Sequence, residues 1–182
     1  MKKKKKILLI IGIITLIVLF TPKSFYEKYY YDFLEWKNLR NKIVWKKNIK
    51  LNWEDFRSTN TEENLVLEAR VGLSIRYYTN PIMFKSKTVF MPNESFVINE
   101  NDSINLRISE AKFNLLEIYR RKMEKYVLKL KNEKIDTLKK IDFDNLNLKY
   151  YELFETEWEK YLESQNETKS LENLEKRIKL EL

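Results

Sequence analysis

Residues 65–77 read LVLEARVGLSIRY, and this stretch decides the fold class. Every odd position from Leu65 to Tyr77 is apolar, and most even positions are polar or charged. Because successive side chains of a strand point to opposite faces of a sheet, this alternation predicts a long strand with one buried face. Asn80-Pro81 then breaks the strand.

Shorter strands are predicted on both sides of this one. We expect two at 87–91 and 95–98, separated by Pro92-Asn93, and one or two more, with a turn, between residues 43 and 56. Connections this short cannot form parallel crossovers. The sheet is therefore expected to be small and mainly antiparallel.

The second half of the chain has helical periodicity. Apolar residues recur every three or four positions, which predicts a helix over 104–131 with Ser103 as its cap. After a charged linker at 132–142, a second helix is predicted over 143–164. A third, highly charged helix over 171–180 is expected to fray. Strands followed by long helices indicate an α+β fold.

The chain opens with Met1 and five lysines, Lys2–Lys6, followed by fourteen uncharged, mostly aliphatic residues at 7–20. A basic cluster before an apolar stretch is typical of an export signal, and its cations remain on the cytoplasmic side. As a helix the apolar stretch rises about 21 Å, short of the roughly 30 Å hydrocarbon core, so neighbouring residues must extend it. We predict an N-terminal signal anchor at 1–23 and a single-pass protein of the cell membrane.

Nothing in the sequence marks a cleavage site after the apolar stretch. A signal peptidase requires small residues there, and Thr21–Phe25 offers no such pattern, so we favour a lasting anchor over secretion after cleavage. Residues 24–42 carry Tyr, Phe and Trp at helical spacing. They predict a juxtamembrane helix that either packs on the domain or lies in the interfacial aromatic belt. Residues 43–182 are expected to form a single extracytoplasmic α+β domain, periplasmic or extracellular.

Composition excludes several classes of function. The net charge of +8 falls once Lys2–Lys6 are set aside, leaving 30 basic against 27 acidic residues, so we expect no nucleic-acid partner. Histidine and cysteine are absent, which removes the commonest general base, the commonest zinc ligands and every thiol nucleophile. The two glycines, Gly12 and Gly72, cannot form a glycine-rich phosphate loop.

Four short motifs occur in a suggestive order. Residues 51–56 read LNWEDF, 69–77 read ARVGLSIRY, 95–97 read SFV and 112–123 read KFNLLEIYRRKM. Over roughly residues 43–130 this order resembles a bacterial family of predicted secreted zinc-dependent proteases, a domain of unknown function. In that family the corresponding helix carries H-E-x-x-H-F-D-I and runs on into E-x-Y-x-R-K-L. The resemblance implies a helix in the position where a zincin holds its metal.

The sequence departs from that family at the zinc site. The two histidines of H-E-x-x-H face one metal from one side of a helix, and the glutamate polarises the bound water. The matching positions here are Ile108 and Lys112 for the ligands and Ser109 for the glutamate, with Glu110 and Glu117 as neighbours displaced along the helix. We therefore expect no metal, no cofactor and no catalytic residue. Lys112 is expected either to lie near the position of the missing metal, held by a nearby carboxylate such as Glu110 or Glu117, or to point to solvent.

These observations predict a non-catalytic relative of the zinc proteases, with a binding or scaffolding role in the cell envelope. Its partners would be the membrane, through the N-terminal helix, and an envelope protein. The alternative is a hydrolase that uses carboxylates, or Ser109 and Lys112 as a pair one turn apart, without zinc. A pocket beside Lys112 would favour binding, and a filled core at Ile108 and Lys112 would favour scaffolding.

Overall fold

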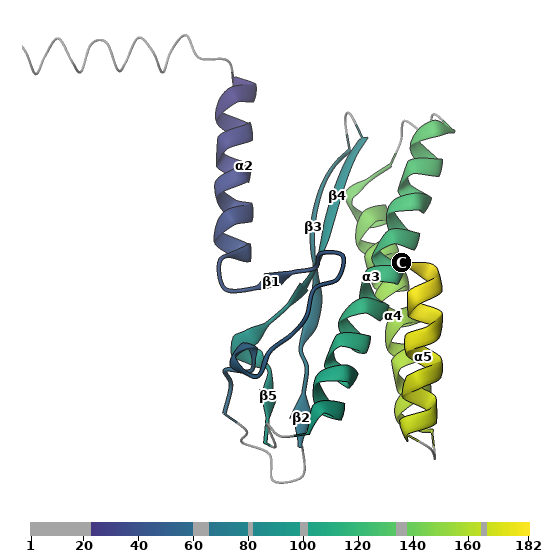
Figure 1. The fold of residues 1–182 in the computed structure, drawn as a ribbon. Helices are drawn as coiled ribbons and strands as arrows, with labels where there is room; N and C mark the ends of the chain where they lie inside the picture. The colour runs from purple at the N-terminus through teal and green to yellow at the C-terminus, as the bar shows by residue number, and fades with distance from the viewer. Residues whose placement is uncertain (1–22, 60–65, 80–81, 99–101, 134–137, 165–166) are drawn as a thin grey trace, which may run out of the picture. The chain divides into compact units, whose positions relative to one another are not determined.

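The computed structural model describes residues 23–59, 66–79, 82–98, 102–133, 138–164 and 167–182. The signal anchor predicted at 1–23 lies almost wholly outside these residues. Two compact units divide the chain between Arg40 and Asn41. Figure 1 shows the helices and strands of both. None of the described helices is long and apolar enough to cross a membrane.

The first unit contributes one described helix, α2, spanning Lys23–Leu39. It confirms the helix predicted over residues 24–42, although it ends three residues earlier. Its aromatic residues are not sequestered, since Tyr30, Phe33 and Trp36 are all exposed.

The second unit is an α+β fold with two small antiparallel sheets. The larger has the order β1-β4-β3, where β1 is Ile43–Val44, β3 is Val71–Thr79 and β4 is Ile82–Phe90. The β3–β4 hairpin is in continuous register, with each residue from Val71 to Thr79 opposite one from Phe90 back to Ile82. The smaller sheet pairs β2, Leu67–Glu68, with β5, Phe96–Val97.

The long strand predicted over 65–77 is therefore split, and only its second part belongs to the hairpin. The two halves have different partners, because β2 pairs with β5 whereas β3 pairs with β4. At the break, the Ser95 hydroxyl accepts a hydrogen bond from the Arg70 amide (3.0 Å) and donates one to the Met91 carbonyl (2.9 Å). Ser95 is fully buried, so its hydroxyl replaces a ladder hydrogen bond that the interruption would leave unmade.

Two other strand predictions need correction. Strand β4 begins at Ile82, five residues before the predicted start at 87, because it pairs with β3 along its whole length. The region 49–56 contains no strand; it contains a short 3-10 helix, Trp53–Asp55. There the Asp55 carboxylate accepts a hydrogen bond from the Asn52 amide at 2.8 Å, which closes the turn.

Three helices complete the fold: α3 at Ser103–Asn132, α4 at Lys140–Leu162 and α5 at Glu167–Glu181. All three lie on the same side of the β3–β4 hairpin in Figure 1, and α3 contacts both the hairpin and the two other helices. The cap of α3 is Asp102 rather than the predicted Ser103, because the Asp102 carboxylate accepts from the Ile104 amide at 3.0 Å.

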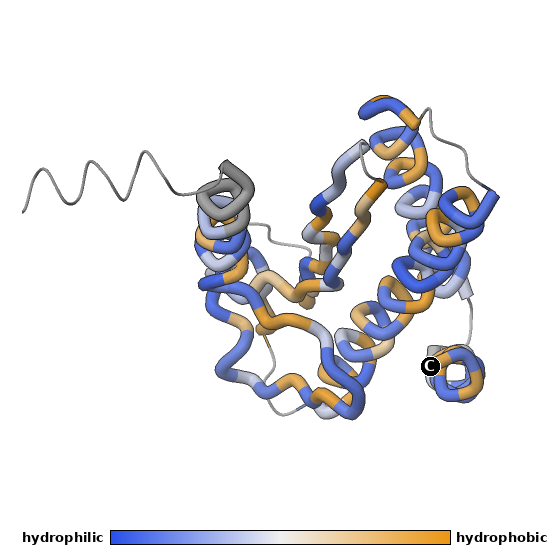
Figure 2. The backbone as a smooth tube through the Cα atoms, turned by 90° about the horizontal axis from the view of Figure 1, so that it is seen from above, coloured by the Kyte–Doolittle hydropathy of each residue, from blue (hydrophilic) through white to orange (hydrophobic). Residues whose placement is uncertain are grey.

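Helix α5 does not fray as the sequence suggested. Leu171, Leu174 and Ile178 lie on one side of it and are buried in the main core. Figure 2 looks down the axis of this last helix, beside the marked C-terminus, and shows both hydrophobic and hydrophilic residues around it. Charged residues cover the rest of the helix, and two of them, Glu175 and Arg177, pair with residues of α3 and α4, so the apolar stripe and these ion pairs together hold the helix in place.

Candidate functional site

Helix α3 carries all three positions that match the family's zinc motif, and two of them are buried. Ile108 is 8 % exposed and belongs to the main hydrophobic core. Ser109 is fully buried, and its hydroxyl donates a 2.8 Å hydrogen bond to the Asn105 carbonyl one turn earlier. The core is therefore filled where the family would place its metal and general base.

Lys112 does not point to solvent, and a carboxylate lies beside its ammonium, although this carboxylate belongs to neither Glu110 nor Glu117. Its side chain is only 16 % exposed, with the ammonium 3.9 Å from a Glu68 oxygen and 5.4 Å from the centre of the Trp158 ring. The anionic neighbour thus comes from strand β2 and not from Glu110 or Glu117. Burial lowers the pKa of Lys112 below its ordinary value, and the nearby Glu68 only partly offsets this.

Glu110 ties the LNWEDF segment to α3. One carboxylate oxygen accepts a hydrogen bond from the Leu51 amide at 3.1 Å, and the other lies 3.0 Å from the Lys50 ammonium. Leu51 is buried in the core beside this contact. The role of Glu110 is therefore to dock the segment that precedes the 3-10 helix.

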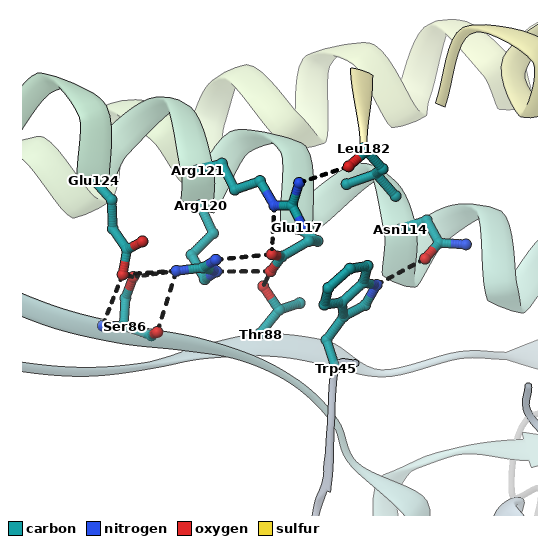
Figure 3. Close-up of polar contacts among 9 residues, drawn as sticks. All are labelled: Trp45, Ser86, Thr88, Asn114, Glu117, Arg120, Arg121, Glu124 and Leu182. Carbon is teal, nitrogen blue, oxygen red and sulfur yellow. Dashed lines mark hydrogen bonds and ion pairs between the residues drawn. The ribbon is translucent and has the colours of Figure 1, made fainter. Parts of the chain in front are cut away.

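Glu117 is the centre of a buried polar network between α3 and β4, drawn in Figure 3. Its carboxylate accepts from the Thr88 hydroxyl (2.8 Å), from two nitrogens of Arg120 (2.6 and 2.7 Å) and from Arg121 (2.8 Å). Arg120 also contacts Glu124 at 2.6 Å. Figure 3 shows both guanidinium groups converging on the one carboxylate.

The electrostatics of Glu117 follow from this arrangement. Burial by itself raises the pKa of its carboxyl group, but the hydrogen bonds from Arg120, Arg121 and Thr88 outweigh that effect. The pKa of Glu117 is thus held below its ordinary value, and the group stays ionised. A carboxylate whose oxygens are all occupied by the protein serves to join helix and sheet.

Metal binding has no obvious location in the part of the chain that the structure describes. No group of three or more acidic side chains there has an arrangement that could hold a metal ion. Glu110 and Glu117 occupy separate surroundings and do not converge.

A groove lies beside α3; of the positions that the sequence singled out, Glu110 lines it and Lys112 does not. It has a volume of about 660 Å³ and is bounded by the segment after β1, by α3 and by α5. Apolar side chains and charged ones both line it. Its lining residues are Trp45, Lys47, Asn48, Ile49, Lys50, Arg107, Glu110, Ala111, Asn114, Glu175, Ile178, Lys179 and Leu182.

Polar contacts hold the walls of this groove in place. The Trp45 indole nitrogen donates to Asn114 at 2.7 Å, as Figure 3 shows, and links the β1 segment to α3. Arg107 on α3 forms a two-pronged ion pair with Glu175 on α5, at 2.6 and 3.0 Å. Bidentate pairs of this kind fix geometry as well as charge, so the groove is a preformed feature.

Of the residues that line the groove, only Glu110 was predicted from the sequence as a neighbour of the candidate site. Its walls come from residues 45–50, 107–114 and 175–182, which are far apart in the chain. The one local signal was the run of lysines at 46–50, and only tertiary packing reveals that it faces α5.

The comparisons with known proteins add nothing to this geometry, since no family model, curated protein or solved structure matches the chain. The resemblance to the predicted zinc proteases therefore stays a prediction from the motifs.

Proposed function

We propose that this protein is held in the cell membrane by its N-terminal segment and presents an extracytoplasmic domain that binds an acidic peptide segment of an envelope partner. The observation that carries the binding role is the groove between the β1 segment, α3 and α5. Anchoring and topology are supported by Lys2–Lys6 and the apolar residues 7–20. The relation to the zinc proteases is part of this proposal and is supported by the order of the motifs.

The charges around the groove favour an anionic partner. Its lining includes four basic side chains and two acidic ones, Glu110 and Glu175. Both acids are already engaged, Glu110 with Lys50 and Glu175 with Arg107. Lys47 and Lys179 are exposed and form no ion pair with any described residue. An incoming carboxylate can therefore pair with these lysines without displacing an existing pair.

The apolar part of the groove favours a peptide over a simple anion. Ala111 and Ile178 are buried in its lining, and Trp45 and Ile49 are half-buried there. Apolar and aromatic surface surrounded by polar groups is the usual composition of a protein-binding site. A short peptide segment with an apolar side chain between carboxylates would contact both the apolar lining and the lysines of the groove.

The catalytic alternative is less well supported. A serine nucleophile must reach its substrate, whereas the Ser109 hydroxyl is fully buried and already donates to a backbone carbonyl. Lys112 is engaged by Glu68 and Trp158. The groove offers contacts suited to binding.

Binding can be tested with the full chain in a nonionic detergent and two fluorescein-labelled hexapeptides. One has two leucines among four glutamates; the other has lysines in place of the glutamates. Fluorescence anisotropy should show binding of the acidic peptide alone. The Lys47→Glu/Lys179→Glu variant should weaken it about tenfold, equivalent to ~1.4 kcal/mol.

The matched control is Lys125→Glu/Lys140→Glu, which makes the same charge change at exposed positions outside the groove. Equal weakening by both double variants would mean that only net charge matters, and the groove would be rejected as the site. Anchoring is tested separately: the chain should resist alkaline extraction from membranes and be digested by protease added outside the cytoplasm.

A further inference from the structure

Helix α2 presents an aromatic face that is exposed to solvent. Tyr30, Phe33 and Trp36 are all more than half exposed, with Trp36 at 57 %. At 100° per residue, these three side chains fall within roughly 120° of the helix circumference, together with Lys37 and Arg40. We call this set of five residues the aromatic face of α2.

The residues of this face are organised among themselves. The rings of Phe33 and Trp36 lie 5.8 Å apart, and the Arg40 guanidinium lies 5.8 Å from the centre of the Trp36 ring. A cation and two large rings thus share one side of the helix. Glu35, by contrast, lies on the other side and is less exposed.

We infer that the aromatic face of α2 rests in the headgroup layer of an anionic bilayer, on the outer leaflet of the membrane that anchors the chain. This inference rests on the proposed anchoring. Its first support is continuity, since α2 begins three residues after the last apolar residue, Phe20, of the stretch expected in the membrane. The outer bilayer surface is therefore within reach of the whole helix.

The chemistry of the face favours lipid over a second protein helix. Tyr and Trp combine an apolar ring with a polar group, and they concentrate at the membrane–water boundary. A helix partner would call for Leu, Ile or Val at regular spacing, and the aromatic face has none of these. Lys37 and Arg40 supply positive charge toward phosphate groups, which adds attraction to anionic lipids.

The composition of α2 also indicates whether this helix crosses the membrane or lies along its surface. Its mixture of acidic, basic and aromatic residues is unsuited to the hydrocarbon core, in keeping with the finding that no described helix could span it. An amphipathic helix with aromatic residues on one side lies along the interface.

The test uses tryptophan fluorescence of the full chain reconstituted into vesicles of phosphatidylcholine and phosphatidylglycerol in equal parts. Either lipid is replaced by a form brominated near the headgroup or deep in the acyl chain, since bromine quenches tryptophan only at close range. All four tryptophans lie in described residues, at 36, 45, 53 and 158. Shallow bromine should quench more strongly than deep bromine, and Trp36→Phe should remove most of that quenching.

Trp53→Phe is the matched control, because Trp53 lies in the second unit outside the groove, and its loss should leave the bromine quenching of Trp36 in place. Flotation of the same vesicles reports anchoring independently: a chain that does not float with them overturns the proposed anchor itself. A chain that floats but is quenched equally with and without Trp36 overturns the present inference alone. Disulfide cross-linking between copies of Tyr30→Cys, with no quenching of Trp36, would also overturn it by assigning the face to a second copy.

Discussion

Replacing Glu117 by glutamine should destabilise the domain far more than a comparable change at the surface. The carboxylate is 2 % exposed and accepts four hydrogen bonds, three of them from guanidinium groups. Glutamine keeps the shape and can still accept from Thr88, but it has no charge, and its amide nitrogen faces donors. Arg120, whose side chain is 13 % exposed, then loses its main counter-charge.

The magnitude follows from what each arginine retains. Removing one partner of a buried ion pair costs about 3–5 kcal/mol. Arg120 keeps Glu124, and Arg121 is exposed enough to turn toward water, so the loss should lie near the lower end, about 3 kcal/mol. The control is Glu133→Gln. Glu133 is an exposed residue 3.7 Å from Lys129, and this change should cost less than about 0.5 kcal/mol.

Urea unfolding of the full chain in nonionic detergent, followed by tryptophan fluorescence and circular dichroism, measures both variants. The Glu117→Gln variant should shift the midpoint at unchanged slope. A loss within about 1 kcal/mol of the control would refute the reasoning, because the network would then contribute no more than a surface pair.

The pH dependence provides an independent check on the same residue. The folded-state pKa of Glu117 lies below the ordinary value of 4.5. Its ionised form therefore stabilises the fold fully above pH 4.5, and this contribution is lost as the pH falls through the folded-state pKa. The stability difference between the wild type and Glu117→Gln should consequently shrink in acid. A difference that stays constant from neutral pH to strong acid would contradict the assignment.

Two further changes test the last helix and the displaced lysine. Leu171→Ala, at a fully buried position of α5, should cost about 2–4 kcal/mol in urea unfolding, whereas Leu180→Ala, 87 % exposed on the same helix, should cost under about 0.5 kcal/mol; equal effects would mean that α5 is not docked. Lys112→Met keeps the buried stem and removes the charge. Because burial lowers the pKa of Lys112, the unfolded chain holds its proton more tightly, so wild-type stability should rise relative to Lys112→Met as the pH approaches 10.5. A difference independent of pH would contradict the buried position of the ammonium.

Much of the fold could be predicted from local patterns. The alternation at 71–77 is that of β3, and the apolar stripe at 104–131 is that of α3, because each pattern reflects which side of a single element is buried. The helix over 24–42 was predicted in the same way and is observed as α2. Boundaries were less accurate, as at the start of β4 and in the 49–56 region, where turn geometry outweighs strand propensity.

The candidate site was less predictable, because its contacts join distant parts of the chain. Helical spacing correctly placed Ile108, Ser109 and Lys112 on one helix, but spacing cannot show what packs against that helix. Ile108 and Ser109 are buried, and Lys112 of α3 contacts Glu68 of strand β2. Because Glu68 and Lys112 are more than forty positions apart, no periodic pattern in the sequence indicates that they pair.

The sequence by itself determined the α+β class, the order of strands and helices, and the absence of histidine and cysteine chemistry. Composition and local periodicity depend only on the order of residues along the chain, so they need no knowledge of tertiary contacts. Tertiary structure alone decided that the predicted strand splits between two sheets and that the charged last helix docks through one apolar stripe. It also decided that Glu117 is enclosed by two arginines and that residues near 47 and 179 share a groove. Such features depend on which surfaces meet when the elements pack, and burial and electrostatic pairing between distant residues are set only at that stage.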